Sequence, residues 1–133
     1  MVPSAFACAA SGVADRGRGQ TRLVRDDQGG PHCLVTGATG YIGGRLVPEL
    51  LDAGFRVRCM SRSVERLRDY PWASRVERVE ADATDPEASR RALDGIEVAY
   101  YLIHALGSGR RFEEADRRAG QNFAAAAAAA NVR

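Results

Sequence analysis

The chain has 133 residues and a formal net charge of +2, so it is long enough for one domain. Its charged residues are scattered and the net charge is too small to argue for nucleic acid or an anionic membrane surface, so neither is predicted as a partner. All 19 basic residues are arginine, and the chain contains no lysine.

Residues 1 to 30 are polar and aperiodic, and they predict a disordered leader. The alanine-rich stretch at residues 5–10 has no basic residue before it and is too short for a secretory signal. No segment approaches the ~18 apolar residues of a membrane span, so we expect a soluble protein without a membrane partner. The three cysteines, Cys8, Cys33 and Cys59, show no close pairing and favour a reduced, cytoplasmic protein.

A glycine-rich stretch follows this leader and organises the rest of the chain. The apolar run from Cys33 to Val35 predicts a buried strand, and the helical spacing of Ile42, Leu46 and Leu50 predicts a helix. Between them lies Gly37-x-x-Gly40-x-x-Gly43, a relative of the G-x-G-x-x-G fingerprint. Backbone N–H groups at the start of such a helix bind a pyrophosphate without a basic side chain. The turn and helix start therefore predict a dinucleotide site that includes Gly37, Thr39, Gly40, Tyr41, Ile42 and Gly43.

Strands and helices alternate along the rest of the chain. The helix that starts at Tyr41 should extend to Ala53, with a mild solvent-side kink at Pro48, whose ring presses on the carbonyl of Gly44. Ser63 can cap a short helix that ends at Tyr70, before Pro71. The remaining predicted elements are strands at 56–60, 76–81 and 98–103, a helix that starts at Asp85-Pro86 and stops at Gly95, and a helix at 112–130.

This βαβαβαβα order predicts an α/β protein with a doubly wound parallel sheet, a Rossmann fold of about four β-α units at residues 31–133. The nearly continuous apolar run 98–103 predicts a strand buried on both faces, with Tyr100 and Tyr101 packed in the core. A complete doubly wound fold usually needs more residues, so we expect this domain to be truncated.

The end of the second predicted strand bears on the choice of cofactor. A carboxylate there binds the ribose 2′-hydroxyl of NAD, whereas an arginine accommodates the 2′-phosphate of NADP. The sequence has Ser61-Arg62 at this place and Arg66 one helical turn further on. NADP is therefore favoured, with NAD as a possible cofactor; in the alternative interpretation, Arg62 is a solvated charge at a strand end.

Two further strand ends carry candidate site residues. Asp82 and Ala83 follow the third strand, where Asp82 can accept a hydrogen bond from an adenine amino group or serve as a turn residue before the next helix. His104 follows the fourth strand, and a lone histidine of this kind is more often structural or solvent-facing than catalytic. His32 and the cysteines lack metal-ligand spacing, so no metal site is predicted.

The glycine motif at residues 35–43, Ser61-Arg62, Asp82-Ala83 and Asn122 resemble the N-terminal half of extended and atypical short-chain dehydrogenase/reductases, including NmrA-like NAD(P)-binding proteins. The resemblance covers residues 32–133. It implies that the glycine loop binds pyrophosphate, Ser61 and Arg62 bind the 2′-phosphate, and Asp82 and Ala83 contact adenine. It also implies that residues from Leu102 through His104 to Ala105 line the path toward the nicotinamide.

The resemblance implies two competing functions. The first is the NADP-preferring dinucleotide-binding part of a reductase or epimerase, whose catalytic Tyr-x-x-x-Lys would lie in a half that this chain lacks. The alternative is a non-catalytic, NmrA-like module that senses the dinucleotide. No catalytic residue is assigned in this chain, because a chain without lysine cannot hold that motif.

Overall fold

The structure is a computed structural model, and it describes residues 29–103 and 109–133. The predicted leader therefore lies outside the described residues, apart from Gly29 and Gly30, and so does His104. The elements in chain order are β1 (His32–Thr36), α2 (Tyr41–Asp52), β2 (Arg56–Ser61), the 3₁₀ turns η1 (Val64–Leu67) and η2 (Ala73–Arg75), β3 (Glu77–Glu80), α3 (Pro86–Leu93), β4 (Val98–Tyr100) and α4 (Arg110–Ala129).

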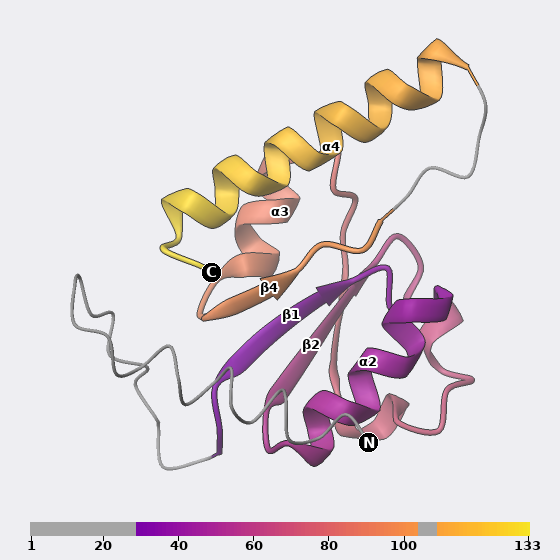
Figure 1. Cartoon of the computed structure of the whole chain (residues 1–133), viewed down its shortest axis with the longest axis vertical. Coiled ribbons are helices and arrows are strands. Elements are labelled where there is room, and N and C mark those ends of the chain that lie inside the picture. The colour runs from indigo at the N-terminus through magenta and orange to yellow at the C-terminus, as the bar shows by residue number, and fades with distance from the viewer. Residues whose placement is uncertain (1–28, 104–108) are drawn as a thin grey trace.

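The four strands form one parallel sheet in the order β3-β2-β1-β4. The chain runs outward from β1 through β2 to β3 and then crosses back to place β4 on the other side of β1. Figure 1 shows α2 on one face of the sheet and α3 and α4 on the other. This is the predicted doubly wound α/β arrangement, and its switch point lies between β1 and β4.

Alternating side chains of the strands divide the core into two clusters, one on each face. Cys33, Val35 and Cys59 pack with Val47 and Leu50 of α2. On the other face, Leu34 and Met60 pack against α3 and α4 in a cluster that includes Ala92, Leu93 and Phe123. Burial raises the pKa of both thiols, Cys33 and Cys59, to about 12, so they remain protonated and inert.

Local signals place the ends of α2 and α3 where the sequence predicts them. Asp85 is the N-cap of α3, and its carboxylate accepts the N–H groups of Glu87 and Ala88 at 2.9 and 3.3 Å. Gly95 ends the turn after α3 with φ +72, a left-handed conformation that suits glycine. Helix α2 continues through Pro48 without a break, and Pro48 is half-buried rather than exposed on the solvent side.

Two predicted elements differ in the structure. The helix expected from Ser63 to Tyr70 is only the 3₁₀ turn Val64–Leu67. The Ser63 side chain caps nothing there, and its N–H group bonds to the Ser61 hydroxyl instead. Strand β4 ends at Tyr100 and is half-buried throughout, not buried on both faces, because it lies at the edge of the four-stranded sheet. The side chain of Tyr101, which follows β4, packs on Phe123 at a ring-centroid distance of 5.0 Å.

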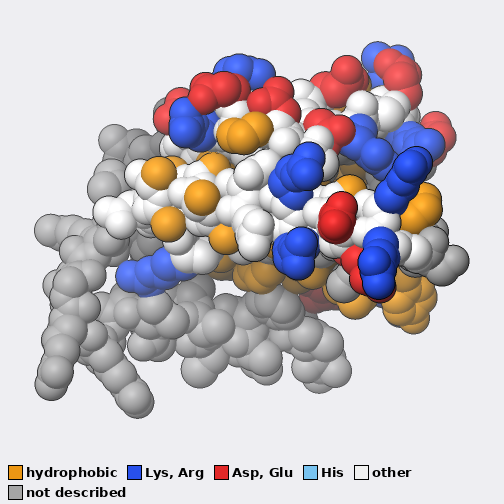
Figure 2. Space-filling model, turned by 90° about the horizontal axis from the view of Figure 1, so that it is seen from above, with side chains coloured by type: hydrophobic (Ala, Val, Ile, Leu, Met, Phe, Trp, Pro, Cys, Tyr) orange, Lys and Arg blue, Asp and Glu red, His pale blue; other side chains and the backbone are white. Residues whose placement is uncertain are grey.

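Helix α4 covers one face of the sheet and contacts α3. Charged side chains gather on its N-terminal half, and small apolar ones on its alanine-rich C-terminal half (Figure 2). Only Ala119, Phe123 and Ala126 of this helix are buried, so most of the alanine tract faces outward. No helix in the described part of the chain has the length and hydropathy required to cross a bilayer.

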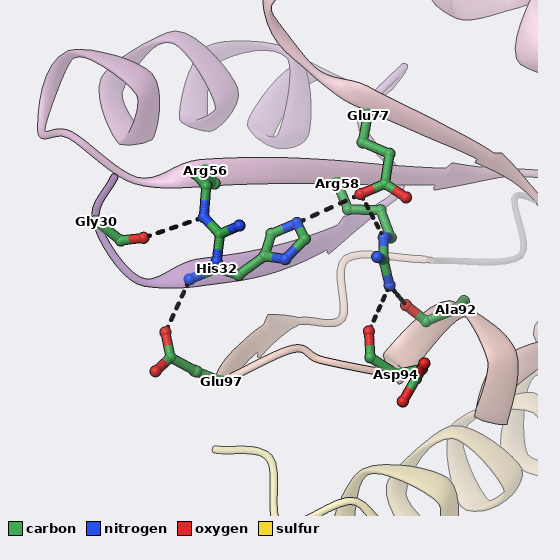
Figure 3. A network of polar contacts seen from close by, with 8 residues as sticks. All are labelled: Gly30, His32, Arg56, Arg58, Glu77, Ala92, Asp94 and Glu97. Atoms are coloured by element: carbon green, nitrogen blue, oxygen red, sulfur yellow. Dashed lines mark hydrogen bonds and ion pairs between the residues drawn. The ribbon is translucent and has the colours of Figure 1, made fainter. Parts of the chain in front are cut away.

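A polar network holds the amino end of the sheet together (Figure 3). Arg58 forms an ion pair with Glu77 at 2.9 Å and donates to the carbonyls of Ala92 and Asp94 at the end of α3. His32 donates its backbone N–H to Glu97, and its ring lies 3.5 Å from Glu77. The network joins β1, β2, β3 and the end of α3, and it leaves the opposite edge of the sheet for the candidate site.

Candidate functional site

The candidate site lies along the border of the sheet that is formed by the carboxyl ends of all four parallel strands. Strands β1, β2, β3 and β4 end there at Thr36, Ser61, Glu80 and Tyr100. The buried Thr36 hydroxyl donates to the carbonyl of Tyr100 at 3.1 Å and accepts the N–H of Leu102 at 3.0 Å. It therefore fastens the segment after β4 beside the end of β1, across the switch point.

The glycine turn after β1 requires glycine at two of its three motif positions. Gly37 has φ +69, and a Cβ there would lie 2.6 Å from the carbonyl oxygen of Leu102. A Cβ on Gly43 would lie 2.2 Å from the carbonyl oxygen of Gly37, so this glycine lets α2 pack directly on the turn. Gly40 is less constrained: it is the N-cap of α2 in an extended conformation, with φ −82 and ψ 172.

Helix α2 begins with unpaired donors. Within the described part of the chain, no acceptor bonds to the N–H groups of Tyr41, Ile42 or Gly43, whereas Gly44 donates to Gly40. These N–H groups and the positive end of the helix dipole form an anion-binding arrangement. Tyr41 and Ile42 are 75 % and 65 % exposed, and the Arg45 guanidinium lies 4.3 Å from the ring centroid of Tyr41. Two large side chains beside free donors are therefore open to a ligand.

The end of β2 presents arginine rather than acid. The Ser61 hydroxyl donates to the carbonyl of Ser63 at 3.0 Å, so it is engaged in a local turn. Arg62 and Arg66 are both exposed. Glu65, the nearest carboxylate along the chain, forms an ion pair with Arg68 at 2.9 Å. Arg62 therefore has no acid beside it in the sequence that competes for its guanidinium, and the nearby carboxylate that its charge acts on is Asp82, at the end of β3.

The loop after β3 is ordered by short-range and long-range hydrogen bonds. One carboxylate oxygen of Asp82 accepts both the backbone N–H and the hydroxyl of Thr84, at 2.9 and 2.8 Å. These bonds, with a smaller contribution from the charge of Arg62, hold the pKa of Asp82 below its usual value. Asn122 of α4 donates to the carbonyl of Thr84 at 3.0 Å. Asp82 is thus an exposed, ionised acceptor on a fixed loop, and Ala83 beside it is buried in the core.

The structure brings the predicted residues at the β1, β2 and β3 ends and Leu102 to one edge of the sheet. The predicted site residue His104 lies outside the described residues. Within residues 29–103 and 109–133, no group of histidine, cysteine or carboxylate side chains has the arrangement of a metal site. Sequence reasoning missed Tyr70 and Trp72, which contact the glycine turn and α2 through side-chain hydrogen bonds.

Comparison with known proteins agrees with this geometry. Residues 37–133 match the family described as NAD(P)H-binding. The chain is 33 % identical over 88 residues to the 3 beta-hydroxysteroid dehydrogenase/Delta 5-->4-isomerase of Mycobacterium tuberculosis. That alignment covers 64 % of this chain and 23 % of the relative, so the chain spans less than a quarter of that protein.

Solved structures share the fold. A short-chain dehydrogenase of Burkholderia cenocepacia, in complex with NADP, matches with a TM-score of 0.62 and 26 % identity over 76 % of this chain and 48 % of that one. A short-chain dehydrogenase/reductase superfamily protein of Agrobacterium tumefaciens, with bound NAD, matches with a TM-score of 0.61 and 24 % identity over 77 % of this chain and 30 % of that one. Given the family match over residues 37–133 and this Rossmann sheet, the chain belongs to the NAD(P)H-binding family of short-chain dehydrogenase/reductase-like proteins.

Proposed function

We propose that residues 31–133 form an NADP-preferring dinucleotide-binding domain of a short-chain dehydrogenase/reductase-like oxidoreductase or epimerase. The observation that carries this proposal is the glycine turn at the β1/β4 switch point, where the N–H groups of Tyr41, Ile42 and Gly43 are unpaired within the described chain. Ligands of open α/β sheets bind at such switch points.

The turn suits the pyrophosphate. Gly37 and Gly43 let the backbone of the turn and of α2 pack closely, and Gly40 starts the helix without a side chain between ligand and backbone. The free N–H groups then donate to phosphate oxygens, and the helix dipole favours the negative charge. Thr39 borders the same turn, and the exposed side chains of Tyr41 and Ile42 would be covered by the cofactor.

The end of β2 suits a 2′-phosphate. A guanidinium presents several N–H donors in a planar fork that matches phosphate oxygens. Arg62 supplies that fork, and Ser61 shapes the turn that carries it. An acid that would bind the ribose 2′-hydroxyl of NAD, and repel the 2′-phosphate, is missing at Ser61-Arg62. NADP is therefore the preferred cofactor in this proposal.

The two outer strand ends complete the proposed site. The second carboxylate oxygen of Asp82 is left to accept from the adenine amino group, beside the backbone of Ala83. Leu102 lies against Gly37 on the other side of the switch point, in the direction assigned to the nicotinamide, and His104 follows it in the chain. Because the chain contains no lysine, its own residues bind and orient the cofactor, and we expect no carbonyl reduction by them.

The test is a titration of the 133-residue chain with NADPH and with NADH, followed by the fluorescence of Trp72, the only tryptophan. We expect tighter binding of NADPH. Arg62→Ala should weaken NADPH binding by about 1.5–3 kcal/mol, roughly 10- to 150-fold, because a hydrogen bond between two charged groups is lost. NADH binding should change far less.

Arg75→Ala is the matched control, because Arg75 is exposed and pairs with Asp52. Asp52 is the last residue of α2, at the opposite end of the helix from the proposed pyrophosphate site. It should leave both affinities unchanged. Equal losses for NADPH and NADH in Arg62→Ala would remove Arg62 from the 2′-phosphate site. Failure of the unmodified chain to bind either dinucleotide would refute the proposed function itself.

A further inference from the structure

Helix α2 contains a carbonyl group whose usual partner is missing. Pro48 has no N–H, so the carbonyl of Gly44, four residues earlier, receives no intrahelical hydrogen bond from it. The indole N–H of Trp72 donates to this carbonyl at 3.3 Å. Trp72 is only 5 % exposed, so the bond forms where solvent has little access to replace it.

Tyr70 joins this indole to the glycine turn. Its ring stacks on Trp72 with centroids 4.7 Å apart and an interplanar angle of 24°. Its hydroxyl donates to the carbonyl of Thr39 at 3.0 Å. A Cβ on Gly44 would lie 3.3 Å from the Tyr70 ring, so the ring packs closely over the first turn of α2.

Two hydrogen bonds, one on each side, fix the peptide group between Thr39 and Gly40. The Tyr70 hydroxyl donates to the carbonyl oxygen of this peptide, which belongs to Thr39. The N–H group of the same peptide belongs to Gly40 and donates to the carbonyl of Gly37 at 3.0 Å. The carbonyl of Gly40 in turn accepts the N–H of Gly44 at 2.9 Å. Rotation of this peptide would break the bonds on both sides and disturb the helix start that presents the free N–H groups.

We propose that Tyr70 and Trp72 are positioning residues that hold the glycine turn and the start of α2 in the conformation that binds a dinucleotide pyrophosphate. This inference rests on the proposed function. The pair acts through the backbone of Thr39 and Gly44, so it would raise affinity by pre-organising the turn. The apparent dissociation constant rises in proportion as the binding-competent conformation loses population.

The test uses Tyr70→Phe in the 133-residue chain, because this change removes the hydroxyl and keeps the stacked ring. NADPH and NADH should both bind about two- to tenfold more weakly, the fold-change that corresponds to one lost hydrogen bond. The factor should be the same for both, because they share the pyrophosphate. Tyr101→Phe is the control, since the buried Tyr101 hydroxyl has no hydrogen-bond partner among the described residues, and it should leave both affinities unchanged.

Amide hydrogen exchange of the ligand-free chain provides a second readout. Tyr70→Phe should accelerate exchange at Gly40 and Gly44, while the amides of β1 and β2 keep their protection. Affinities equal to those of the unmodified chain, or faster exchange spread evenly over the sheet, would overturn the positioning role and leave the proposed function standing. If the unmodified chain binds neither dinucleotide, the proposed function fails, and the binding role of Tyr70 fails with it.

Discussion

Replacement of Gly37 by alanine tests whether the glycine turn and the segment after β4 are in direct backbone contact. Two costs are expected at this position. The φ of +69 is unfavourable for a residue with a Cβ, and that Cβ would lie 2.6 Å from the carbonyl oxygen of Leu102. The oxygen belongs to the backbone, and the N–H of the same residue is held by Thr36, so it cannot move aside cheaply.

Gly95 is the matched control because it has nearly the same φ, +72, and no atom within 4 Å of an added Cβ. Gly95→Ala therefore carries only the left-handed strain, about 1–2 kcal/mol, partly offset by about 0.4–1 kcal/mol from the reduced entropy of the unfolded chain. Gly37→Ala adds the close contact, and forced overpacking costs about 1–3 kcal/mol. The free energy of unfolding should thus fall by about 1–3 kcal/mol more in Gly37→Ala than in Gly95→Ala.

Urea unfolding followed by the fluorescence of Trp72 measures this difference directly, because the shared φ strain cancels between the variants. Gly37→Ala should also lose NADPH affinity, and Gly95→Ala should keep it, because Gly95 lies in the turn after α3, outside the site. Equal loss of stability in the two variants would refute the close approach of the glycine turn to the segment after β4.

Three further predictions concern other contacts. Asn122→Ala should lower the free energy of unfolding by about 0.5–1.5 kcal/mol through loss of its bond to Thr84, whereas alanine at the exposed neighbour Gln121 should be neutral in the same urea assay. Burial and the nearby positive charges of Arg58 and Arg56 lower the pKa of His32 in the folded state. Below about pH 6.5, His32 is therefore protonated more readily in the unfolded chain than in the folded one, which favours unfolding. Stability should therefore decline from pH 6.5 to 5, and a decline of the same size in His32→Gln would contradict this origin. In a Cys8→Ser background, Cys33 and Cys59 should resist a thiol reagent at pH 8 until urea is added, and prompt labelling of the folded chain would show that they are accessible.

The features that sequence predicted well depend on residues close together in the chain. Asp85 followed by Pro86 starts α3 because a carboxylate and a ring with fixed φ act on the next few residues. Gly37 and Gly95 mark turns because their left-handed backbone is a local property. The parallel sheet then follows from the alternation of strands and helices.

The features that sequence missed depend on contacts between distant segments. The position of Tyr70 before Pro71 predicts the end of a helix, whereas its hydroxyl donates to the carbonyl of Thr39, 31 positions away along the chain. Trp72 binds the carbonyl of Gly44 across 28 positions. Pro48 predicts a mild kink in the helix, but nothing local to it indicates that the indole of Trp72 binds the carbonyl of Gly44. Likewise, the position of Ser63 in the sequence is typical of a helix N-cap. In the structure the Ser61 hydroxyl accepts a hydrogen bond from the Ser63 N–H, and the segment forms only a 3₁₀ turn.

The most direct test of the central claim is a residue-resolved NMR titration of the 133-residue chain with NADPH, which reports where the dinucleotide binds. If the pyrophosphate binds at the start of α2, the largest amide shifts should fall at residues 40–43, with a second group around Arg62 that is much weaker with NADH. The amides of the polar network around His32 and Glu97 should stay unchanged, because that network lies at the opposite edge of the sheet. Shifts centred on that opposite edge, or their absence from residues 40–43 at saturating NADPH, would contradict the site.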